Sequence, residues 1–503
     1  MSGNLFSLFR AAMPERGRAF IRDAPGRAIT YGGMLDLSGR MANVLAELGV
    51  APGDRVAAQV EKSPEALILY LACLRAGAAY LPLNPAYTLK ELEYFLGDAE
   101  PKVLAASPKK TGAAALAERL RVAAVVTLGA DGAGSLMERA RGAQAEFADA
   151  DVAADDLAAI LYTSGTTGRS KGAMLSHANL ASNALALKDV WKFTRDDVLL
   201  HALPIFHTHG LFVASNTILA SGAAMIFLPR FDVDEIFRLL PQATTMMGVP
   251  TFYVRLLQDA RLTGEATRHM RLFVSGSAPL LAETHREWRA RTGHAILERY
   301  GMTETNMNTS NPYEGERVPG SVGLPLPGVS LRISDPQTGA ELPRGEIGMI
   351  EVRGANVFSG YWRMPEKTRE EFRADGFFIT GDLGRIDGRG YVHIAGRGKD
   401  LIISGGLNVY PKEVESEIDA MEGVAESAVI GVPHRDLGEG VTAVVVTKPG
   451  AALSENAMIA ALRGRLASYK LPKRIFFAGD LPRNTMGKVQ KNVLRERYKD
   501  IFL

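Results

Sequence analysis

Short apolar runs alternate along most of the chain with segments whose apolar residues recur at helical spacing. The runs 157–162, 225–228 and 271–275 predict buried strands, and the segments 232–240 and 281–292 predict helices. This alternation is typical of mainly parallel sheets covered by helices. The pattern therefore predicts an α/β fold, with a large N-terminal domain of several lobes.

The character of the chain changes after about residue 396. Short strands are predicted at 401–404, 428–432, 441–447 and 475–478, and helices at 410–421 and 455–467. The first of these helices opens with Pro411, at a position where the missing N–H costs nothing. We expect an N-terminal domain at 1–396, a hinge at 397–400 within the polar sequence GRGKD, and a small mobile α+β domain at 401–503. A chain of 503 residues is too long for one hydrophobic core.

Composition excludes several classes of protein. The formal net charge is only +2 and no basic run carries interleaved aromatic residues, so nucleic acid is not the expected partner. The single cysteine, Cys73, excludes a disulfide framework and fits a buried position in a cytoplasmic protein. Its apolar run, 66–83, contains Arg75 and is too short to cross a bilayer. The N-terminal segment has no clean cleavage site, so we expect neither a signal peptide nor a membrane anchor.

Residues 162–172 read YTSGTTGRSKG directly after a predicted strand. Glycines let a backbone approach phosphate oxygens, while hydroxyls, amides and a lysine supply donors to an anion. The spacing differs from the Walker pattern, which excludes a P-loop phosphotransferase. A glycine-rich surface turn is the alternative, but the preceding strand and the following lysine favour a phosphate site. Its candidate residues are Thr163, Ser164, Gly165, Thr166, Thr167, Gly168 and Lys171.

Four more motifs follow in order: SGSAPL at 275–280, YGMTET at 300–305, TGD at 380–382 and PRNTMGK at 482–488. On these motifs the chain resembles the adenylate-forming superfamily of acyl-CoA synthetases, luciferases and adenylation domains over nearly its whole length. One departure is Ser170, where the family usually has proline before the lysine. The resemblance implies ATP, Mg²⁺ and CoA as cofactor and co-substrates.

The resemblance also implies roles for individual residues. Tyr300 would stack on adenine, Thr303 would contact the α-phosphate, Glu304 would ligate Mg²⁺, and Asp382 with Arg397 would hold the ribose and phosphate. Lys488 would enter the site and stabilise the charge that gathers during adenylation. The remaining implied contacts are Ser277, Ala278, Pro279, Glu298, Gly301 and Met302 in the nucleotide and acyl site, Lys399 at the pivot, and Gly405 and Gly406 beside the pantetheine arm.

The acid is indicated by a closer likeness to the malonyl-CoA synthetases, which share SGSAPL and the run ERYGMTETNMNTS found here at 298–310. That likeness assigns Arg286 to the second carboxylate of a small dicarboxylate, malonate or methylmalonate. The helical pattern alone places Arg286 away from the apolar stripe, as a solvated arginine. We expect the acyl pocket to contain His207, Thr208, His209, Ser277 and Met307 as well. His207 and His209 lack a third ligand of suitable spacing, so a zinc site is not expected.

Alternatives remain open at this stage. A ligase for short monocarboxylates or aryl acids shares every nucleotide motif and would differ at Arg286. A loading domain for a carrier protein would need a carrier module, and none is evident in the sequence. A regulatory nucleotide-binding protein would need neither Glu304 nor Lys488. The motif around Lys488 also suggests a lysine acyltransferase and deacylase as partners, since acylation would erase its charge. The sequence does not indicate an oligomeric state.

Overall fold

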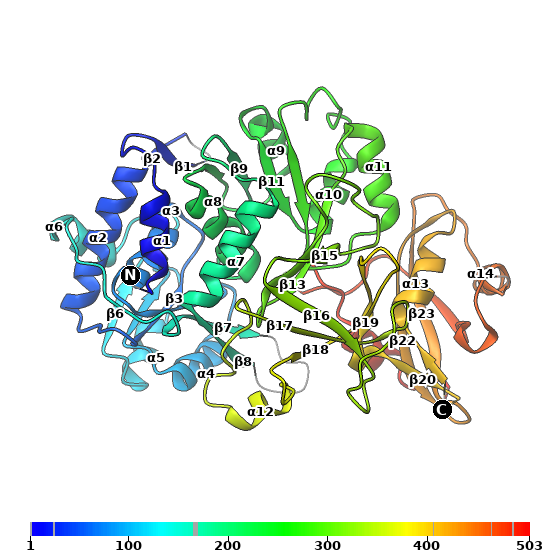
Figure 1. Cartoon of the computed structure of the whole chain (residues 1–503). Helices are drawn as coiled ribbons and strands as arrows, with labels where there is room; N and C mark the ends of the chain where they lie inside the picture. The colour runs from blue at the N-terminus through cyan, green and yellow to red at the C-terminus, as the bar shows by residue number, and fades with distance from the viewer. Residues whose placement is uncertain are drawn as a thin grey trace.

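The computed structural model describes residues 3–23, 26–163, 170–405, 407–463, 465–484 and 487–502 (Figure 1). Five of the predicted phosphate-site residues, Ser164, Gly165, Thr166, Thr167 and Gly168, lie outside the described residues, and so does Gly406. The described residues form four sheets, and helices cover the two largest.

The first large sheet has six strands, and all its neighbours pair in parallel except the last two. Its order is β6 (Ala124–Thr127), β5 (Val103–Ala106), β3 (Arg55–Gln59), β4 (Ala79–Pro82), β7 (Leu157–Thr163) and β8 (Lys171–Ser176). The helices of this lobe are α2 (Tyr31–Glu47), α3 (Pro64–Arg75), α4 (Leu89–Ala99), α5 (Ala113–Arg119) and α6 (Ser135–Gly142).

The second large sheet has nine strands and a parallel centre. Its order is β15 (Leu324–Pro325), β14 (Asn306–Ser310), β13 (Leu297–Met302), β12 (Leu272–Ser275), β11 (Thr245–Gly248), β9 (Val198–His201), β10 (Ala224–Phe227), β1 (Ala19–Asp23) and β2 (Ala28–Thr30). Its helices are α1 (Leu5–Ala12), α7 (His177–Val190), α8 (Asn216–Ser221), α9 (Val233–Leu239), α10 (Pro250–Leu257) and α11 (Ala282–Thr292).

Two smaller sheets complete the chain. The antiparallel sheet contains β16 (Val329–Ser334), β17 (Gly348–Gly354), β18 (Phe378–Ile386) and β19 (Val392–Arg397), with α12 (Pro365–Glu370) between β17 and β18. The C-terminal sheet contains β21 (Leu407–Val409), β20 (Ile402–Ser404), β23 (Gly438–Thr447), β22 (Val424–His434) and β24 (Arg474–Ala478), with α13 (Pro411–Asp419), α14 (Glu455–Leu462) and α15 (Lys491–Tyr498).

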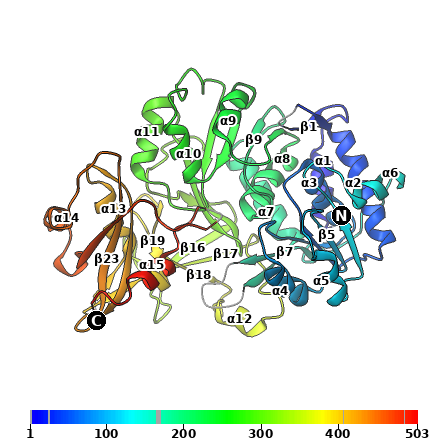
Figure 2. The ribbon, with the colours of Figure 1, turned by 180° about the vertical axis from the view of Figure 1, so that it is seen from behind.

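A single 3₁₀ turn, Gly398–Asp400, connects β19 to the C-terminal sheet. That sheet has hydrophobic clusters of its own, separate from those of the large sheets. Both views place it at one end of the molecule, next to α11 and opposite the first large sheet (Figures 1 and 2). The α/β prediction with a separate C-terminal sheet region is therefore confirmed.

The predicted elements are all present, with some changes in length. Ser176 caps α7 through a reciprocal capping box, and Pro411 occupies the first turn of α13. Strand β22 runs from Val424 to His434 rather than over 428–432, because its polar residues lie on the less buried positions of a paired strand. Helix α14 ends at Leu462 rather than at 467, and the sequence has a poor helix former, glycine, at 464.

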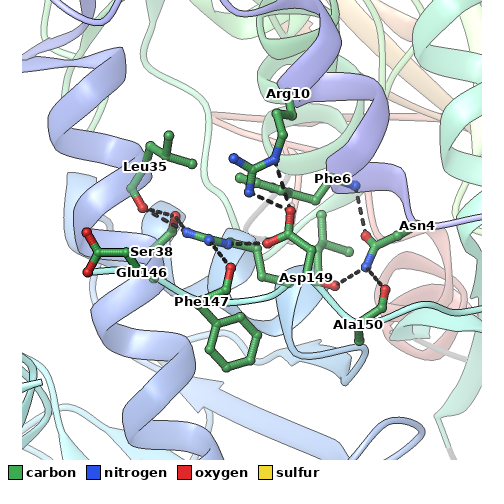
Figure 3. A network of polar contacts seen from close by, with 12 residues as sticks. Asn4, Phe6, Arg10, Leu35, Ser38, Glu146, Phe147, Asp149 and Ala150 are labelled. Atoms are coloured by element: carbon green, nitrogen blue, oxygen red, sulfur yellow. Dashed lines mark hydrogen bonds and ion pairs between the residues drawn. The ribbon is translucent and has the colours of Figure 1, made fainter. Parts of the chain in front are cut away.

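A buried polar network ties the N-terminal helix to the first lobe (Figure 3). Arg75, on α3, pairs with Asp149 at 2.6 Å, and Asp149 also accepts from Arg10 of α1. The Arg75 guanidinium donates to the carbonyl oxygens of Leu35 and Phe147 at 2.8 and 2.9 Å. Segments that are distant in the sequence are thus held together by this network.

Cys73, also on α3, is buried. No helix among the described residues is long and apolar enough to span a bilayer.

Candidate active site

Tyr300, Asp382 and Arg397 meet where β13, β18 and β19 converge. The Tyr300 hydroxyl donates to Asp382 Oδ2 at 2.6 Å, and Arg397 Nε lies 2.9 Å from Asp382 Oδ1. Asp382 is buried, and the pKa of Arg397 is raised, chiefly by the charge of Asp382. A buried carboxylate between an aromatic ring and a guanidinium can accept from a vicinal diol if one of its present partners moves. The predicted nucleotide residues are therefore brought together.

Glu304 belongs to a second group of polar side chains that contact one another. Tyr361 Oη lies 3.0 Å from Glu304 Oε1 and 2.6 Å from Glu371 Oε2. Lys171 donates to Glu371 Oε1 at 2.9 Å and lies 4.0 Å from the centre of the Tyr361 ring. Burial raises the pKa of Glu304 above its ordinary value. The motifs around Lys171 and Glu304 are thus joined by Tyr361 and Glu371, two residues that the sequence analysis did not identify.

The donor set near Glu304 bears on metal binding. Among the described residues, no group of three or more His, Cys, Asp and Glu side chains could hold an ion alone. One buried carboxylate suits Mg²⁺, which proteins commonly bind with one or two carboxylates while substrate phosphates supply further ligands. Glu304 fits that role.

Lys488 reaches the site from the C-terminal region on a short hairpin. Within it, Asn484 N donates to Lys488 O and Lys488 N donates to Asn484 Oδ1, each at 2.9 Å. A methyl group placed on Gly487 would contact Thr251 of α10, so the hairpin touches the nine-stranded lobe. Lys488 remains accessible, yet the surrounding protein and the charge of Arg397 lower its pKa, while Asp382 and Glu304 oppose that effect. The lysine therefore lies among the residues of both preceding clusters.

The residues predicted for the acyl pocket lie in the segment after β9 and the segment after β12. His209 Nδ1 lies 3.2 Å from Ser277 Oγ, and the His209 amide approaches His207 Nδ1 at 3.4 Å. Ser277 has φ +73°, a left-handed conformation that is uncommon for serine. Burial, followed by the charges of Lys488 and Arg299, lowers the pKa of His207 to about 3. The imidazole is therefore neutral at physiological pH.

Arg299 is a third residue that sequence reasoning missed. It lies on β13 with 3% of its surface exposed, and its Nε and Nη2 atoms have no hydrogen-bond partner among the described residues. A Cβ on Gly276 would lie 2.4 Å from Arg299 Cζ, so this glycine makes room for the guanidinium next to Ser277. Burial lowers the pKa of Arg299 to about 9, and its charge lowers the pKa of both His207 and His209. The available signal was strand alternation, which turns Arg299 away from Glu298 and Tyr300.

The structure does not bring Arg286 together with the residues predicted to form the acyl pocket. Arg286 is exposed on α11, whose buried residues are Thr284, His285, Trp288 and Thr292. The helix buries the apolar stripe that its sequence shows, and Arg286 lies off that stripe. The arginine that lies against the pocket comes instead from the strand β13.

The other predicted residues lie on several elements. Thr163 ends β7 opposite Lys171, and Ala278 and Pro279 follow Ser277. Glu298 accepts from Leu280 N at 3.1 Å, and burial raises its pKa to about 7. Gly301 and Met302 end β13, Thr303 follows it, and Met307 is buried on β14, where its Cε would crowd a Cβ on Gly301. Thr208 is buried, Lys399 is exposed in the connecting 3₁₀ turn, and Gly405 follows β20.

Comparisons with known proteins agree with this arrangement. The profile described as AMP-binding enzyme matches residues 8–362, and that described as AMP-binding enzyme C-terminal domain matches 413–488. Feruloyl-CoA synthase from Amycolatopsis is 38% identical, covering 94% of each chain. Malonate–CoA ligase from Arabidopsis thaliana is 33% identical, covering 98% of this chain and 89% of its own.

Solved structures give a closer likeness. ATP-bound MatB from Rhodopseudomonas palustris is 66% identical over 100% of both chains, with a TM-score of 0.98. The apo form of that protein, equally identical and equally covered, superposes with a TM-score of 0.88. Both forms have the same sequence identity to this chain, so the difference in TM-score comes from how their parts are arranged. The arrangement of this chain is closer to that of the ATP-bound form than to that of the apo form. On the matched profiles and relatives, the chain belongs to the family of AMP-binding enzymes.

Proposed function

We propose that the protein is an AMP-forming malonate–CoA ligase. Malonate attacks the α-phosphate of ATP to give malonyl-adenylate and pyrophosphate, and the thiol of CoA then displaces AMP to give malonyl-CoA. The observation that carries the choice of acid is the buried guanidinium of Arg299, which has no carboxylate partner among the described side chains. A buried cation of this kind favours a ligand that brings its own negative charge.

The nucleotide roles follow from the clusters described above. We assign Tyr300 to the adenine and Asp382 to the ribose, and the contact of Arg397 with the same carboxylate supports this assignment. Lys171 would exchange Glu371 for phosphate oxygens, and Glu304 would hold Mg²⁺ together with them. When bound, Mg²⁺ neutralises charge on the phosphates. Thr303 and the glycine-rich sequence are proposed as further phosphate contacts.

In the first step Lys488 would stabilise the developing charge between the attacking carboxylate and the α-phosphate. The charges that act on Lys488 include those of Arg397, Asp382 and Glu304, three residues assigned to the nucleotide. Neutral His207 is placed to donate or accept one hydrogen bond without adding a second positive charge beside Arg299. Positioned donors of this kind lower the barrier when charge gathers on phosphorus-bound oxygens.

Selection of the acid rests on complementarity with Arg299. The second carboxylate of malonate would pair with that guanidinium, with Ser277 and His209 beside it. A monocarboxylate would leave the buried charge without a partner, which is a penalty of several kcal/mol. Met307 and Thr208 are the proposed boundary around the α-carbon, where methylmalonate would need room for a methyl group.

The second step requires CoA to reach the adenylate. We propose that residues 401–503 rotate about Lys399 in the hinge 397–400, which withdraws Lys488 from the domain 1–396 and brings Gly405 toward the pantetheine arm. The single 3₁₀ turn between the sheets and the likeness to an ATP-bound form support this proposal. A cytoplasmic location and control through acylation of Lys488 are further parts of the proposal.

The test is pyrophosphate release with ATP, Mg²⁺ and CoA against malonate, methylmalonate, succinate, acetate, butyrate, benzoate and ferulate. We expect malonate to give the highest kcat/KM by at least ~100-fold over acetate and butyrate, the discrimination that a site with an unpaired polar group reaches. Preference for an aryl acid would favour the second candidate, an aryl-acid CoA ligase, which the 38% identity to feruloyl-CoA synthase supports. No release with any acid would reject the ligase function.

A further inference from the structure

Lys62 is a half-buried lysine that the proposed reaction does not use. It follows β3 and lines a cavity of about 470 Å³ between the two large sheets, with Tyr80 on one side and Phe231 on the other. Within the described part of the chain no carboxylate lies within ion-pairing distance of Lys62, and burial lowers its pKa. A lysine held without a counter-ion needs another partner, and the structure gives it one on the second sheet.

That partner is His201, the buried last residue of β9. Lys62 Nζ lies 3.0 Å from His201 Nδ1, 2.8 Å from the His201 carbonyl oxygen and 4.1 Å from the centre of the Phe227 ring. His201 Nε2 lies 2.9 Å from the carbonyl oxygen of Gly210. Since a carbonyl oxygen only accepts, Nε2 carries the hydrogen, Nδ1 is the acceptor, and Lys62 is its donor.

Gly210 belongs to the wall of the acyl pocket. It lies in the π-helical turn His209–Ser215, directly after His207 and Thr208. A Cβ on Gly210 would lie 2.0 Å from the carbonyl oxygen of Pro204, so the segment 204–210 folds tightly back on itself. The same Gly210 carbonyl accepts from Ser215 Oγ at 2.8 Å. A shift of this carbonyl would therefore move the histidines that face Arg299.

We propose that Lys62 is a positioning residue for the acyl pocket. It acts through His201 and the Gly210 carbonyl, and it holds His207 and His209 in place from the opposite sheet. Lys62 donates to His201 Nδ1, which fixes both the tautomer and the orientation of the ring. Without that donor, the hydrogen bond that orients the His201 ring with Nε2 toward the Gly210 carbonyl is lost. This inference rests on the proposed function, since the pocket it serves is the one assigned to the acid.

The first experiment compares Lys62→Met with Glu61→Gln, a neighbour that lines the same cavity but accepts from Ser107 instead of touching His201. The assay is ATP–pyrophosphate exchange without CoA, which reports the first step alone. We expect Lys62→Met to lower kcat/KM for malonate by about tenfold or more, mainly through KM, as a buried acceptor loses its donor. The ATP half-saturation should stay within about twofold, and Glu61→Gln should behave like the wild type within the same margin.

Two results would overturn the proposal. A purely stabilising pair would lower the melting temperature of Lys62→Met and leave the malonate KM of the folded enzyme unchanged. A direct contact of Lys62 with CoA would leave the exchange reaction intact and reduce only thioester formation. If Lys62→Met does not fold, Lys62→Ala, which also lacks a donor, replaces it in both assays.

The second experiment is a double-mutant cycle with His201→Gln, whose amide can still donate to Gly210. If Lys62 acts through His201, adding Lys62→Met to that variant should change kcat/KM by less than about twofold. Losses that multiply would show that the two residues act independently and would overturn the relay. If the wild type shows no activity with malonate, the proposed function is rejected instead. The double-mutant cycle is then measured with the acid that the enzyme does use.

Discussion

Replacement of Arg299 by methionine tests the acyl pocket most directly. Methionine fills similar space without charge, so the change removes the guanidinium while keeping most of the packing around Gly276 and Ser277. Arg299 is 3% exposed and lies on a strand between Glu298 and Tyr300, which have separate contacts. The variant should lose its preference for malonate and keep its binding of ATP.

The magnitude follows from burial. The pKa of Arg299 is lowered to about 9 because burial disfavours the charged form. That is more than ~3 pH units below an ordinary arginine, and at about 1.4 kcal/mol per unit the unpaired charge costs on the order of 4–5 kcal/mol. A second carboxylate on the acid would offset this cost in the wild type. In the variant that carboxylate is buried alone, a loss of roughly 3–5 kcal/mol, or about 150- to 4,000-fold in kcat/KM.

Steady-state pyrophosphate release with malonate and with butyrate measures this effect, alongside thermal unfolding without ligand. The malonate kcat/KM should fall by the factor above, the butyrate value should hold or rise, and the unliganded variant should melt at a higher temperature. Arg286→Met is the matched control, because Arg286 is exposed on α11 and should change neither acid by more than about twofold. Malonate kinetics within threefold of the wild type in Arg299→Met, or a large loss in Arg286→Met, would refute the reasoning.

Three further variants test the remaining assignments. Lys488→Ala should abolish pyrophosphate release yet spare thioester formation from supplied malonyl-adenylate, and equal loss of both steps would contradict its role. Tyr361→Phe should raise the Mg²⁺ and ATP concentrations needed for half-maximal rate by about tenfold, since Glu304 and Glu371 lose a shared hydroxyl contact; unchanged Mg²⁺ dependence would reject it. Burial raises the pKa of Glu298 to about 7. Between roughly pH 4.3 and 7 the folded state therefore keeps a proton on Glu298 that the unfolded chain has lost. The stability of the wild type declines as the pH rises through that range. Glu298→Gln should remove the decline and be more stable at pH 8 by up to about 3–4 kcal/mol, and identical pH slopes in thermal unfolding would exclude this explanation.

Local signals predicted the elements well. Pro411 marks a helix start because proline geometry acts within one turn, and β7, β10 and β12 follow from short apolar runs. Motif likeness also brought Tyr300 and Asp382 together, although 82 positions separate them in the chain.

Prediction failed where orientation depends on packing between distant segments. Arg286 and Arg299 both lie near the pocket motifs in the sequence, but a helix turns the first toward solvent and Gly276 makes room for the second. The acyl-pocket likeness therefore selected an arginine that the structure leaves exposed, whereas the helical pattern placed Arg286 correctly. Tyr361 could not be identified either, because its contact with Glu304 depends on how β13 packs against the segment before α12.

The 3₁₀ turn Gly398–Asp400 makes Lys488 a tethered reagent. The C-terminal sheet touches the rest of the molecule through limited contacts, such as the exposed pair Lys448–Glu283 at 2.9 Å, which is worth less than ~1 kcal/mol. A short tether of this kind supplies an effective concentration in the millimolar range. If the chain were cut at the turn, Lys488 would lie on a separate polypeptide. The rate of adenylation would then depend on the concentrations of the two pieces.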